Sequence, residues 1–448
     1  MPLLGYNLGY RQLNWPRWLC WLLILPLLSC TPPAAKSPLP QQTTSERPLA
    51  QHLYIWQRQW TPHHPLALSQ SQADFSQLRV LALQYHVSPQ GPVWFETQLP
   101  LALLKQDGRP LWLVIRLDGQ LPQLPQAALQ QRLAKLLRQW QQAGLRPAVI
   151  EIDYDSARSQ LPAYQRWLQQ RRAQIPSDIQ LAITALPDWL QSPNFPTLLQ
   201  QVDILTLQLH SVLSPAQGLF DPVRARNWAS QLAVLSHKPF YLALPAYHSA
   251  LVRQPTSASG SSATAASWLV ESEVPQLYAG ERQELWLDPI ALQQLQAWLQ
   301  QQPWPQLQGL VWFRLPLPTD QRSLPLSTLQ AIVRQQPLQQ QLQLSLTGKA
   351  PVWELWALNQ GQTPELLPRQ LKLDGSACLQ TEAMAGASLE RDSNLESSAK
   401  LAHNNQAYQL QLPNRRLGPG QRQLLAWFHC QQLKLQDTAP NAGVAATD

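Results

Sequence analysis

The sequence has little cysteine and little charge for its length. Only four of its 448 residues are cysteine, and only 14% are Asp, Glu, Lys or Arg. No Cys/His cluster has the spacing of a metal site, so neither a metal nor another cofactor is implied. The formal net charge of +7 is a mild bias with no basic stripe, which argues against a nucleic-acid partner.

The N-terminal apolar run is too short to be read as a membrane-spanning helix. Basic residues precede an apolar run from Trp18 to Leu28, and Ser29 and Cys30 follow it. This order is typical of an export signal. The end of the run resembles a bacterial lipobox, in which Cys30 would become the lipidated first residue. A plain signal peptide and an uncleaved anchor are the alternatives.

The segment after Cys30 predicts how the protein is attached. Residues 1–29 would be the signal peptide, and residues 30–49, rich in Pro, Thr, Ser and Gln, a flexible tether. Thr31 follows the cysteine, and by resemblance to enterobacterial sorting this favours a lipid-anchored protein of the cell envelope, at the outer membrane and facing the periplasm. Cys378 and Cys430 could form one disulfide in that oxidising compartment.

Eight short apolar runs, each ending in polar or aromatic residues, follow from residue 50 onward. Amphipathic helical stretches lie between several of them, as at Pro125 to Ala143 with Gly144 as a stop. Strands that are apolar on both faces and alternate with helices predict an α/β fold, a closed (β/α)8 barrel of the TIM type over residues 50–336. An open doubly wound sheet is the alternative, but no Gly-rich phosphate loop follows any run. The runs are Leu53 to Trp60, Leu78 to His86, Leu111 to Asp118, Ala148 to Asp155, Ile179 to Ala185, Val202 to His210, Pro239 to Tyr247 and Gly309 to Leu315.

Two places depart from this regular pattern. Val93 to Leu104 could be a hairpin or a short helix, and Gln254 to Glu281 could be a mobile loop or lid.

After Pro337 the sequence pattern changes to β-type runs in which apolar and polar residues alternate, and no stretch has a strong helical pattern. It predicts a small antiparallel β-sandwich over residues 337–435, with a mobile loop at Met384 to Asn405 and a disordered tail at 436–448.

The fourth run carries three acids at alternate positions, Glu151, Asp153 and Asp155. A strand would place them on one face, about 7 Å apart between successive Cα atoms. Like charges that close raise one another's pKa, as general-acid chemistry near neutral pH requires. The alternative is structural, with Glu151 paired to Arg116 or Arg58 because an unpaired charge inside a barrel is costly.

Polar and aromatic residues gather at the predicted carboxyl ends of the strands, where barrel chemistry is expected. We expect Asp155 to protonate a glycosidic oxygen and Asp153, one pleat deeper, to raise its pKa and then stabilise positive charge on the sugar. The candidates for contact with substrate are Trp60, Tyr247 and Trp312 for the sugar ring and Arg58, His86, Gln208 and His210 for polar contacts.

Two resemblances accompany these patterns. Several segments, among them Tyr54 to Arg58, Ile183 to Leu190 and Ala243 to Tyr247, look like a family of exported bacterial proteins catalogued as a domain of unknown function and expected to be barrels. The acids of the fourth run are similar to the Asp-x-Asp-x-Glu ending of the fourth strand in chitinase-like glycoside hydrolases. By that resemblance the middle Asp is Asp153, and the acid falls at Asp155, where Asp replaces Glu.

Two functions remain open from the sequence. One is a glycoside hydrolase that acts on a polysaccharide. The other is a non-catalytic lipoprotein that binds a glycan or an envelope partner, since a fold alone does not give activity.

The first prediction concerns the anchor. Mass spectrometry of the mature N-terminus should find lipid on Cys30, because stable anchoring generally needs more than one acyl chain and lipobox processing supplies them. Cys30→Ala should then leave the protein unprocessed or soluble. A Cys30→Ala protein that stays membrane-bound with the same N-terminus as the wild-type protein would contradict this prediction.

Overall fold

The computed structural model describes residues 48–119, 121, 123–210, 218–253, 268–271, 282–391, 405–436 and 442–444. The expected signal peptide, the tether up to residue 47 and Cys30 lie outside these residues, as do most of the expected loop at Gln254 to Glu281 and residues 392–404. Among the described residues, no helix is both long and apolar enough to cross a membrane. Residues 44–448 group as one compact unit.

Eight parallel strands close into a barrel, as predicted. In the sheet order β1, β12, β8, β7, β6, β5, β4, β2, the two ends meet because β1 also pairs with β2. This closure rules out the open sheet. The strands are β1 (Ala50–Ile55), β2 (Gln77–Ser88), β4 (Leu111–Leu117), β5 (Val149–Tyr154), β6 (Gln180–Ala185), β7 (Ile204–Gln208), β8 (Phe240–Pro245) and β12 (Leu307–Phe313).

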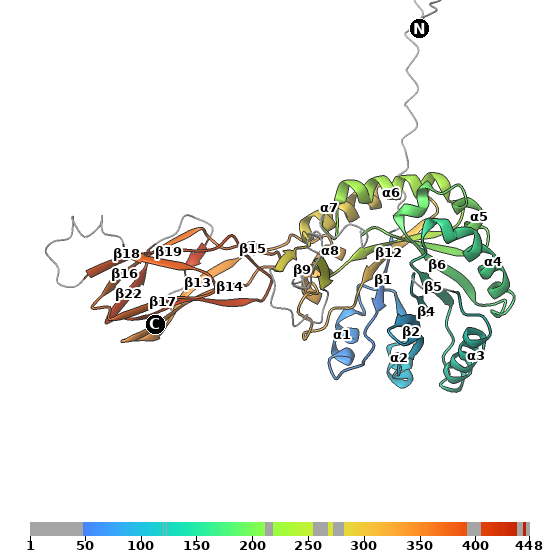
Figure 1. Cartoon of the computed structure of the whole chain (residues 1–448), viewed down its shortest axis with the longest axis horizontal. Helices are drawn as coiled ribbons and strands as arrows, with labels where there is room; N and C mark the ends of the chain where they lie inside the picture. Colours follow the sequence, from blue (N-terminus) through green and yellow to red (C-terminus); the bar gives the residue numbers. More distant parts are fainter. Residues whose placement is uncertain are drawn as a thin grey trace, which may run out of the picture. The chain divides into compact units, whose positions relative to one another are not determined.

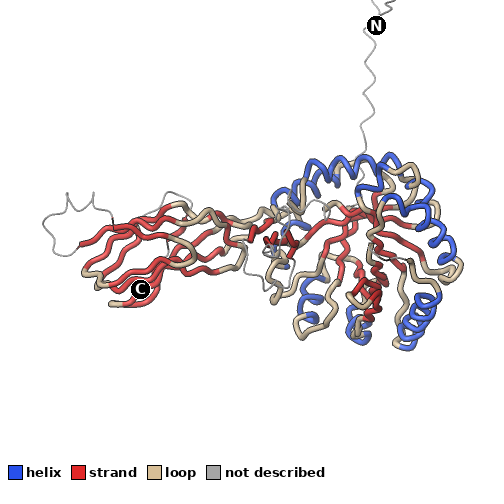
Figure 2. Tube along the Cα trace, in the orientation of Figure 1, coloured by secondary structure: helices blue, strands red, loops and turns tan. Residues whose placement is uncertain are grey.

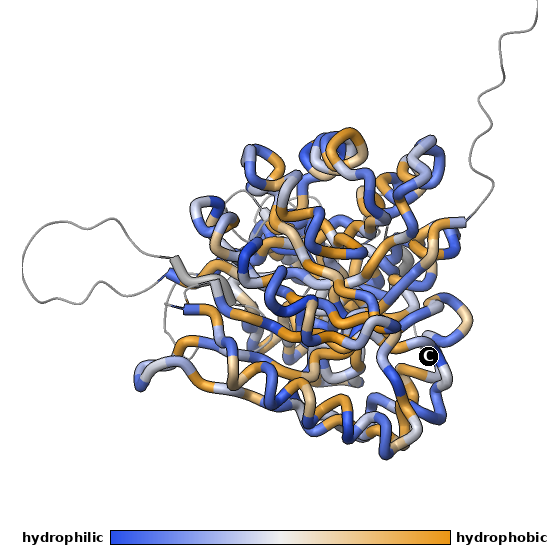
Figure 3. The backbone as a smooth tube through the Cα atoms, turned by 90° about the vertical axis from the view of Figure 1, so that its right-hand side faces the viewer, coloured by the Kyte–Doolittle hydropathy of each residue, from blue (hydrophilic) through white to orange (hydrophobic). Residues whose placement is uncertain are grey.

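Helices cover the outside of this barrel (Figure 1). In α3 (Ala127–Gln142) the buried residues Leu129, Leu133, Leu136 and Trp140 follow helical spacing, and Figure 3 shows both hydrophobic and hydrophilic positions along the helices. Asp221 and Asp288 cap α6 and α7, because each side chain accepts hydrogen bonds from two backbone N–H groups of the first turn. The remaining helices are α1 (His64–Ser71), α2 (Leu101–Asp107), α4 (Leu161–Arg172), α5 (Phe195–Leu199), α6 (Pro222–Leu235), α7 (Pro289–Gln300) and α8 (Leu326–Val333).

Both irregular places contain secondary structure. The segment from Val93 onward holds a strand and a helix: β3 (Gly91–Glu96) forms an antiparallel hairpin with β2, and α2 follows. After β8 the chain forms a small antiparallel sheet of β9 (Ser249–Arg253), β10 (Trp268–Glu271) and β11 (Arg282–Leu285). Residues 268–271, within the expected loop, are therefore a strand.

The C-terminal part is built from strands and loops (Figure 2), consistent with the expected small sandwich. One sheet has the order β17, β21, β14, β13, β23 and another the order β18, β19, β16, β22, and a buried apolar cluster contains residues of both. The strands are β13 (Leu342–Lys349), β14 (Val352–Asn359), β15 (Glu365–Leu366), β16 (Gln370–Ser376), β17 (Gln380–Ala383), β18 (Ser388–Arg391), β19 (Asn405–Gln411), β20 (Arg416–Leu417), β21 (Arg422–His429), β22 (Gln432–Leu435) and β23 (Ala442–Val444).

The expected tail is not wholly without structure. Residues 442–444 form β23, which pairs in parallel with β13, so a disordered tail is wrong for these three residues. The physical reason is that the edge of β13 offers unpaired backbone groups to a passing strand.

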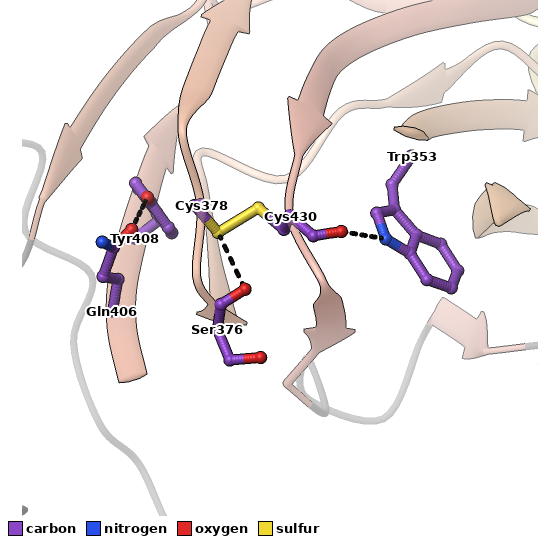
Figure 4. The surroundings of a disulfide bond; sticks show 6 residues. All are labelled: Trp353, Ser376, Cys378, Gln406, Tyr408 and Cys430. Carbon is purple, nitrogen blue, oxygen red and sulfur yellow. Dashed lines mark hydrogen bonds between the residues drawn. A yellow bond between two sulfur atoms is a disulfide. The ribbon is translucent and has the colours of Figure 1, made fainter. Parts of the chain in front are cut away.

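A disulfide joins Cys378 and Cys430 (Figure 4). Cys378 lies between β16 and β17, and Cys430 between β21 and β22, so each cysteine is in a connection from one sheet to the other. The Cys430 carbonyl accepts a hydrogen bond from Trp353 Nε1 at 3.1 Å. A bridge across a sequence separation of 52 residues restricts the unfolded chain enough to stabilise the fold by about 4 kcal/mol.

A charged pair lies inside the barrel without access to water. The side chains of Arg79 on β2 and Glu151 on β5 are both 0% exposed, and Arg79 Nη1 lies 2.8 Å from Glu151 Oε1. Tyr54 Oη donates to the same carboxylate oxygen at 2.9 Å, and Arg79 Nη1 also donates to Thr206 Oγ1. Burial raises the pKa of Tyr54 well above its usual value, so its hydroxyl stays a donor.

Aromatic rings surround this arginine. The Arg79 guanidinium carbon lies 3.6 Å from the ring centroid of Trp112 and 4.7 Å from that of Tyr241. Burial, followed by the charge of Arg79, lowers the pKa of His52 well below its usual value, so the imidazole near the guanidinium is neutral. The expected pair of Glu151 with Arg116 is therefore wrong. Arg79 on β2 reaches the layer of Glu151 inside the barrel, whereas Arg116 lies one pleat higher, in register with Asp153.

The second prediction concerns this pair. Glu151→Ala should lower the free energy of unfolding by about 3 to 5 kcal/mol, because it leaves a buried guanidinium without its counter-charge. Urea unfolding followed by circular dichroism measures the change.

Two controls accompany that measurement. The double variant Arg79→Met/Glu151→Met should recover part of the loss, since it removes both charges. Asp178→Ala, which breaks the exposed pair of Arg146 and Asp178, should change the stability little. A Glu151→Ala protein as stable as the Asp178→Ala protein would contradict the prediction.

Candidate active site

The acids of β5 point toward one arginine at the carboxyl end of the barrel. Arg116, the last inward residue of β4, donates through Nη1 to Asp153 Oδ2 at 2.6 Å and through Nη2 to Asp155 Oδ2. The two aspartates and Glu151 thus lie on one face, as their alternation predicts. Arg116 is the partner of the upper two acids, and Arg79 is the partner of Glu151.

The two aspartates differ in exposure, and burial perturbs the pKa of Asp153. The side chain of Asp153 is 6% exposed, and that of Asp155 is 27% exposed. Burial raises the pKa of Asp153 to about 6, although the charge of Arg116 opposes the rise, and the negative charge of Asp155 adds to it. Asp153 therefore keeps a proton at a pH where an ordinary Asp carboxyl has lost it, while the Asp155 side chain reaches solvent.

A loop backbone fixes the position of Asp155. A Cβ placed on Gly119, just after β4, would lie 2.0 Å from the Asp155 carbonyl oxygen and 3.3 Å from its Cβ. Only glycine allows the β4 loop to approach this closely. Residue 119 is therefore part of what orients the carboxylate.

Aromatic rings lie beside the acids on the inner face of the barrel. The centroid of Phe313 lies 4.9 Å from that of Trp56 and 5.6 Å from that of Tyr247, and His210 contacts Tyr247 at 6.0 Å. Burial raises the pKa of Tyr247 to about 12, with opposing effects of Arg314 and Asp155, which are therefore its electrostatic neighbours. Trp56, Tyr247 and Phe313 are each partly exposed, so this group reaches the surface.

Gln208 ends β7 and His210 follows the strand, and the two side chains contact each other. Gln208 Nε2 lies 3.0 Å from His210 Nε2, and both residues are buried. Burial lowers the pKa of His210 to about 4, opposed by a hydrogen bond to the backbone of Ala243. This imidazole is neutral at physiological pH, so it can exchange hydrogen bonds but carries no charge to a ligand.

The β2–β3 hairpin supplies further polar groups. Arg58 donates through Nε and Nη2 to Gln84 Oε1 at 3.0 and 2.7 Å, and its guanidinium lies 5.2 Å from the Phe95 centroid. Gln84 is in register with Arg116, so the two side chains share a face of the sheet. His86 lies further along β2 and is half-buried.

Two of the predicted aromatic contacts do not lie on the inner face. Trp312 is 0% exposed, packs in the cluster between strands and helices, and donates through Nε1 to Gln51 Oε1 at 2.8 Å. The prediction for Trp312 is wrong, because side chains alternate along β12 and it is Phe313 that points inward. Trp60 packs against the same outer cluster, with its ring 4.6 Å from His64.

Sequence reasoning missed Arg79, Trp56 and Phe313. For Arg79 the signal was a charge within the apolar run that begins at Leu78. For Trp56 the signal was its two-residue spacing from Tyr54, which continues the inward face of β1. Among the described residues, no group of three or more His, Cys, Asp or Glu could hold a metal ion.

The fold is a closed (β/α)8 barrel with acids and aromatic rings at the carboxyl ends of its strands. Residues 107–318 match the family model described as Domain of unknown function (DUF3142), which confirms the resemblance to a family of unknown function. No curated protein matches the sequence.

Several solved structures are similar to this chain. The spore cortex-lytic enzyme SleL of Bacillus cereus is 14% identical with a TM-score of 0.44, and the match covers 64% of this chain and 74% of that one. A chitinase of Chromobacterium violaceum is 13% identical with a TM-score of 0.42, covering 64% and 98%. The xylanase and alpha-amylase inhibitor protein XAIP-II of Scadoxus multiflorus is 11% identical with a TM-score of 0.40, covering 64% and 99%. The similar structures therefore include both enzymes and an inhibitor.

The third prediction follows from the raised pKa of Asp153. An unfolded Asp titrates near pH 4, so between about pH 4 and pH 6 the folded state keeps a proton that the unfolded state has lost. The free energy of unfolding must then fall as the pH rises through this window, by about 3 kcal/mol in total from this group. Asp153→Asn should abolish that slope.

Thermal and urea unfolding between pH 3.5 and 7 (roughly the window set by these pKa values) test this prediction. Asp178→Asn is the matched control, because its carboxylate is exposed and pairs only at the surface. Parallel pH profiles for the wild-type and Asp153→Asn proteins would show that Asp153 titrates normally.

Proposed function

We propose that the carboxyl end of the barrel hydrolyses a polysaccharide, with Asp153 and Asp155 acting as one acid pair. The observation that carries the proposal is the arrangement of a buried aspartate of raised pKa and a partly exposed aspartate on one arginine, beside partly exposed aromatic rings. General acids of glycoside hydrolases need such a raised pKa, and flat rings cover the apolar faces of sugars.

In this proposal the pair holds one proton below about pH 6. Two interacting carboxyl groups titrate as a unit, so the proton belongs to the pair. Asp155 is the member that reaches solvent, and it presents the proton to the glycosidic oxygen. Asp153, left charged on Arg116, then stabilises the positive charge that develops on the sugar until a water molecule adds to the anomeric carbon and returns one proton to the pair. Trp56, Tyr247 and Phe313 contact the ring, and Gln208 and His210 bind hydroxyl groups.

A non-catalytic glycan-binding protein is the second candidate. The observation that favours it is the double ion pair of Arg116, because a nearby cation stabilises the charged form of each carboxylate and weakens it as a proton carrier. In either case a carbohydrate is the partner, and the membrane is reached through the proposed lipid on Cys30.

The fourth prediction separates these candidates. Purified protein is assayed for hydrolysis and for binding on a panel of neutral and acidic polysaccharides. Asp155→Asn should lower kcat by roughly 100-fold or more and leave binding within a few-fold, because general acid catalysis contributes about 10² to 10⁴ in rate. Asp153→Asn should also lower kcat and remove the fall in rate that the wild type shows as the pH rises through about 6.

Two aromatic variants test the binding surface, one within the proposed site and one control outside it. Phe313→Ala should weaken binding of the same polymer, since it removes a ring of the inner face, and Trp427→Ala should not, because Trp427 lies in β21. Hydrolysis that survives both aspartate variants would overturn the enzymatic proposal. Binding without any hydrolysis would support the second candidate.

A further inference from the structure

A separate cavity of 1370 Å³ lies away from the acid pair. Its walls come from β11 and the two residues after it (282–287), from residues 317–325 after β12, and from residues 364–366 and 414–421 around the paired strands β15 and β20. Neither Asp153 nor Asp155 lines it. The volume exceeds the roughly 300 to 1,000 Å³ of ordinary small-molecule pockets, so it suits an extended ligand.

Positive charge predominates among the residues that line this cavity. They include four arginines, Arg282, Arg322, Arg415 and Arg416, against the two carboxylates of Glu284 and Asp320. Both carboxylates already pair with an arginine. Glu284 lies 3.1 Å from Arg322 Nη2, and Asp320 lies 3.0 Å from Nη2 of Arg314, which does not line the cavity.

Two of these arginines project from a fixed backbone. The N–H of Leu367 donates to the Arg415 carbonyl at 3.0 Å, and Arg416 pairs with Leu366 in the β15–β20 ladder. Arg416 Nη1 donates to the Pro364 carbonyl at 3.0 Å, which holds its guanidinium at the wall. Both side chains are exposed to solvent. The charge of Arg416 is therefore presented in a set place and needs little ordering to bind an anion, and Arg415 beside it extends from a backbone that is already held.

The part of the lining that contains His248 and Trp286 is also well packed. The rings of His248 and Trp286 stack with centroids 4.3 Å apart, and His248 Nε2 lies 3.7 Å from Glu284. Amide side chains such as Gln283, Asn414 and Gln421 also line the cavity. They offer both donors and acceptors, as the hydroxyl groups of a sugar chain require.

We propose that this cavity binds a strand of an anionic glycan, through carboxylate or phosphate groups held by Arg415 and Arg416. Arginine suits both groups because its planar fork of N–H donors matches two oxygens at once. A glycan fits better than a membrane surface, because the site is concave and a bilayer cannot enter it. This binding site is independent of the acid pair, so it would hold a polymer whether or not the barrel cleaves it.

The experiment compares one double variant with a matched control on the full mature chain. Arg415→Ala/Arg416→Ala removes two charges from the cavity. Arg369→Ala/Arg391→Ala removes two exposed charges from the same part of the chain, outside the cavity. Circular dichroism checks that both variants fold. Titration calorimetry then measures binding to polygalacturonate, to a phosphomannan, to dextran and to phosphatidylglycerol vesicles.

The cavity variant should bind the preferred anionic polymer about tenfold or more weakly, and the control within about twofold of the wild type. Polygalacturonate and phosphomannan separate a carboxylate ligand from a phosphate ligand. Asp155→Asn should leave this affinity unchanged, which distinguishes a failure here from a failure of the proposed hydrolysis. Equal losses in the two double variants, equal affinity for dextran, binding to vesicles alone, or no binding to any probe would each overturn the proposal.

Discussion

The buried pair of Arg79 and Glu151 is the interaction on which the inner barrel depends. Neither side chain reaches water, so each charge is stabilised by the other, by hydrogen bonds with Tyr54, His52, Thr184 and Thr206, and by the neighbouring rings. Such a pair is expensive to desolvate and contributes little net stability, but removing one member is costly. The inward side chains of several strands must therefore keep their places for the pair to persist.

The same constraint extends upward to the acid pair. Glu151 lies one pleat below Asp153 on β5, and its negative charge is a further reason why the pKa of Asp153 is raised. Arg116 pairs with Asp153 and Asp155, as Arg79 pairs with Glu151. Arg79 and Arg116 thus pair with the three acids of β5 in successive layers. The remaining acid, Asp155, is the one nearest solvent, which is where a polar ligand would meet it.

The sequence was sufficient to predict the barrel and to place the three acids of β5 on one face of their strand. Eight apolar runs with helices between them are enough to predict parallel strands, and alternate positions within one strand are enough to place three carboxylates on one face. The partner of Glu151 could not be predicted in this way. Which inward residues share a height inside a barrel depends on the stagger between strands, and a bulge between Leu81 and Leu83 shifts the register of β2 after Arg79.

The error at Trp312 has a different origin. Both faces of a parallel barrel strand are apolar, so hydrophobicity does not distinguish the inside of the barrel from the helix side. Leu310 and Trp312 occupy one face of β12, and Val311 and Phe313 occupy the other. The polar residues after the strand did not show which of the two faces points into the barrel. A bulky aromatic residue near the end of a strand was therefore assigned to the wrong face, one position away from the ring that lies among the inner residues.

The disulfide bears on how the protein is made. Both cysteines lie in connections between the two C-terminal sheets, and the barrel as described contains no cysteine. A chain produced in a reducing cytosol would therefore complete its barrel with all covalent bonds in place, while its two C-terminal sheets lacked their cross-link. The barrel and the C-terminal sheets would then reach their full stability at different stages. The barrel could complete its fold in any compartment, and the C-terminal sheets would gain their full resistance to unfolding only after oxidation.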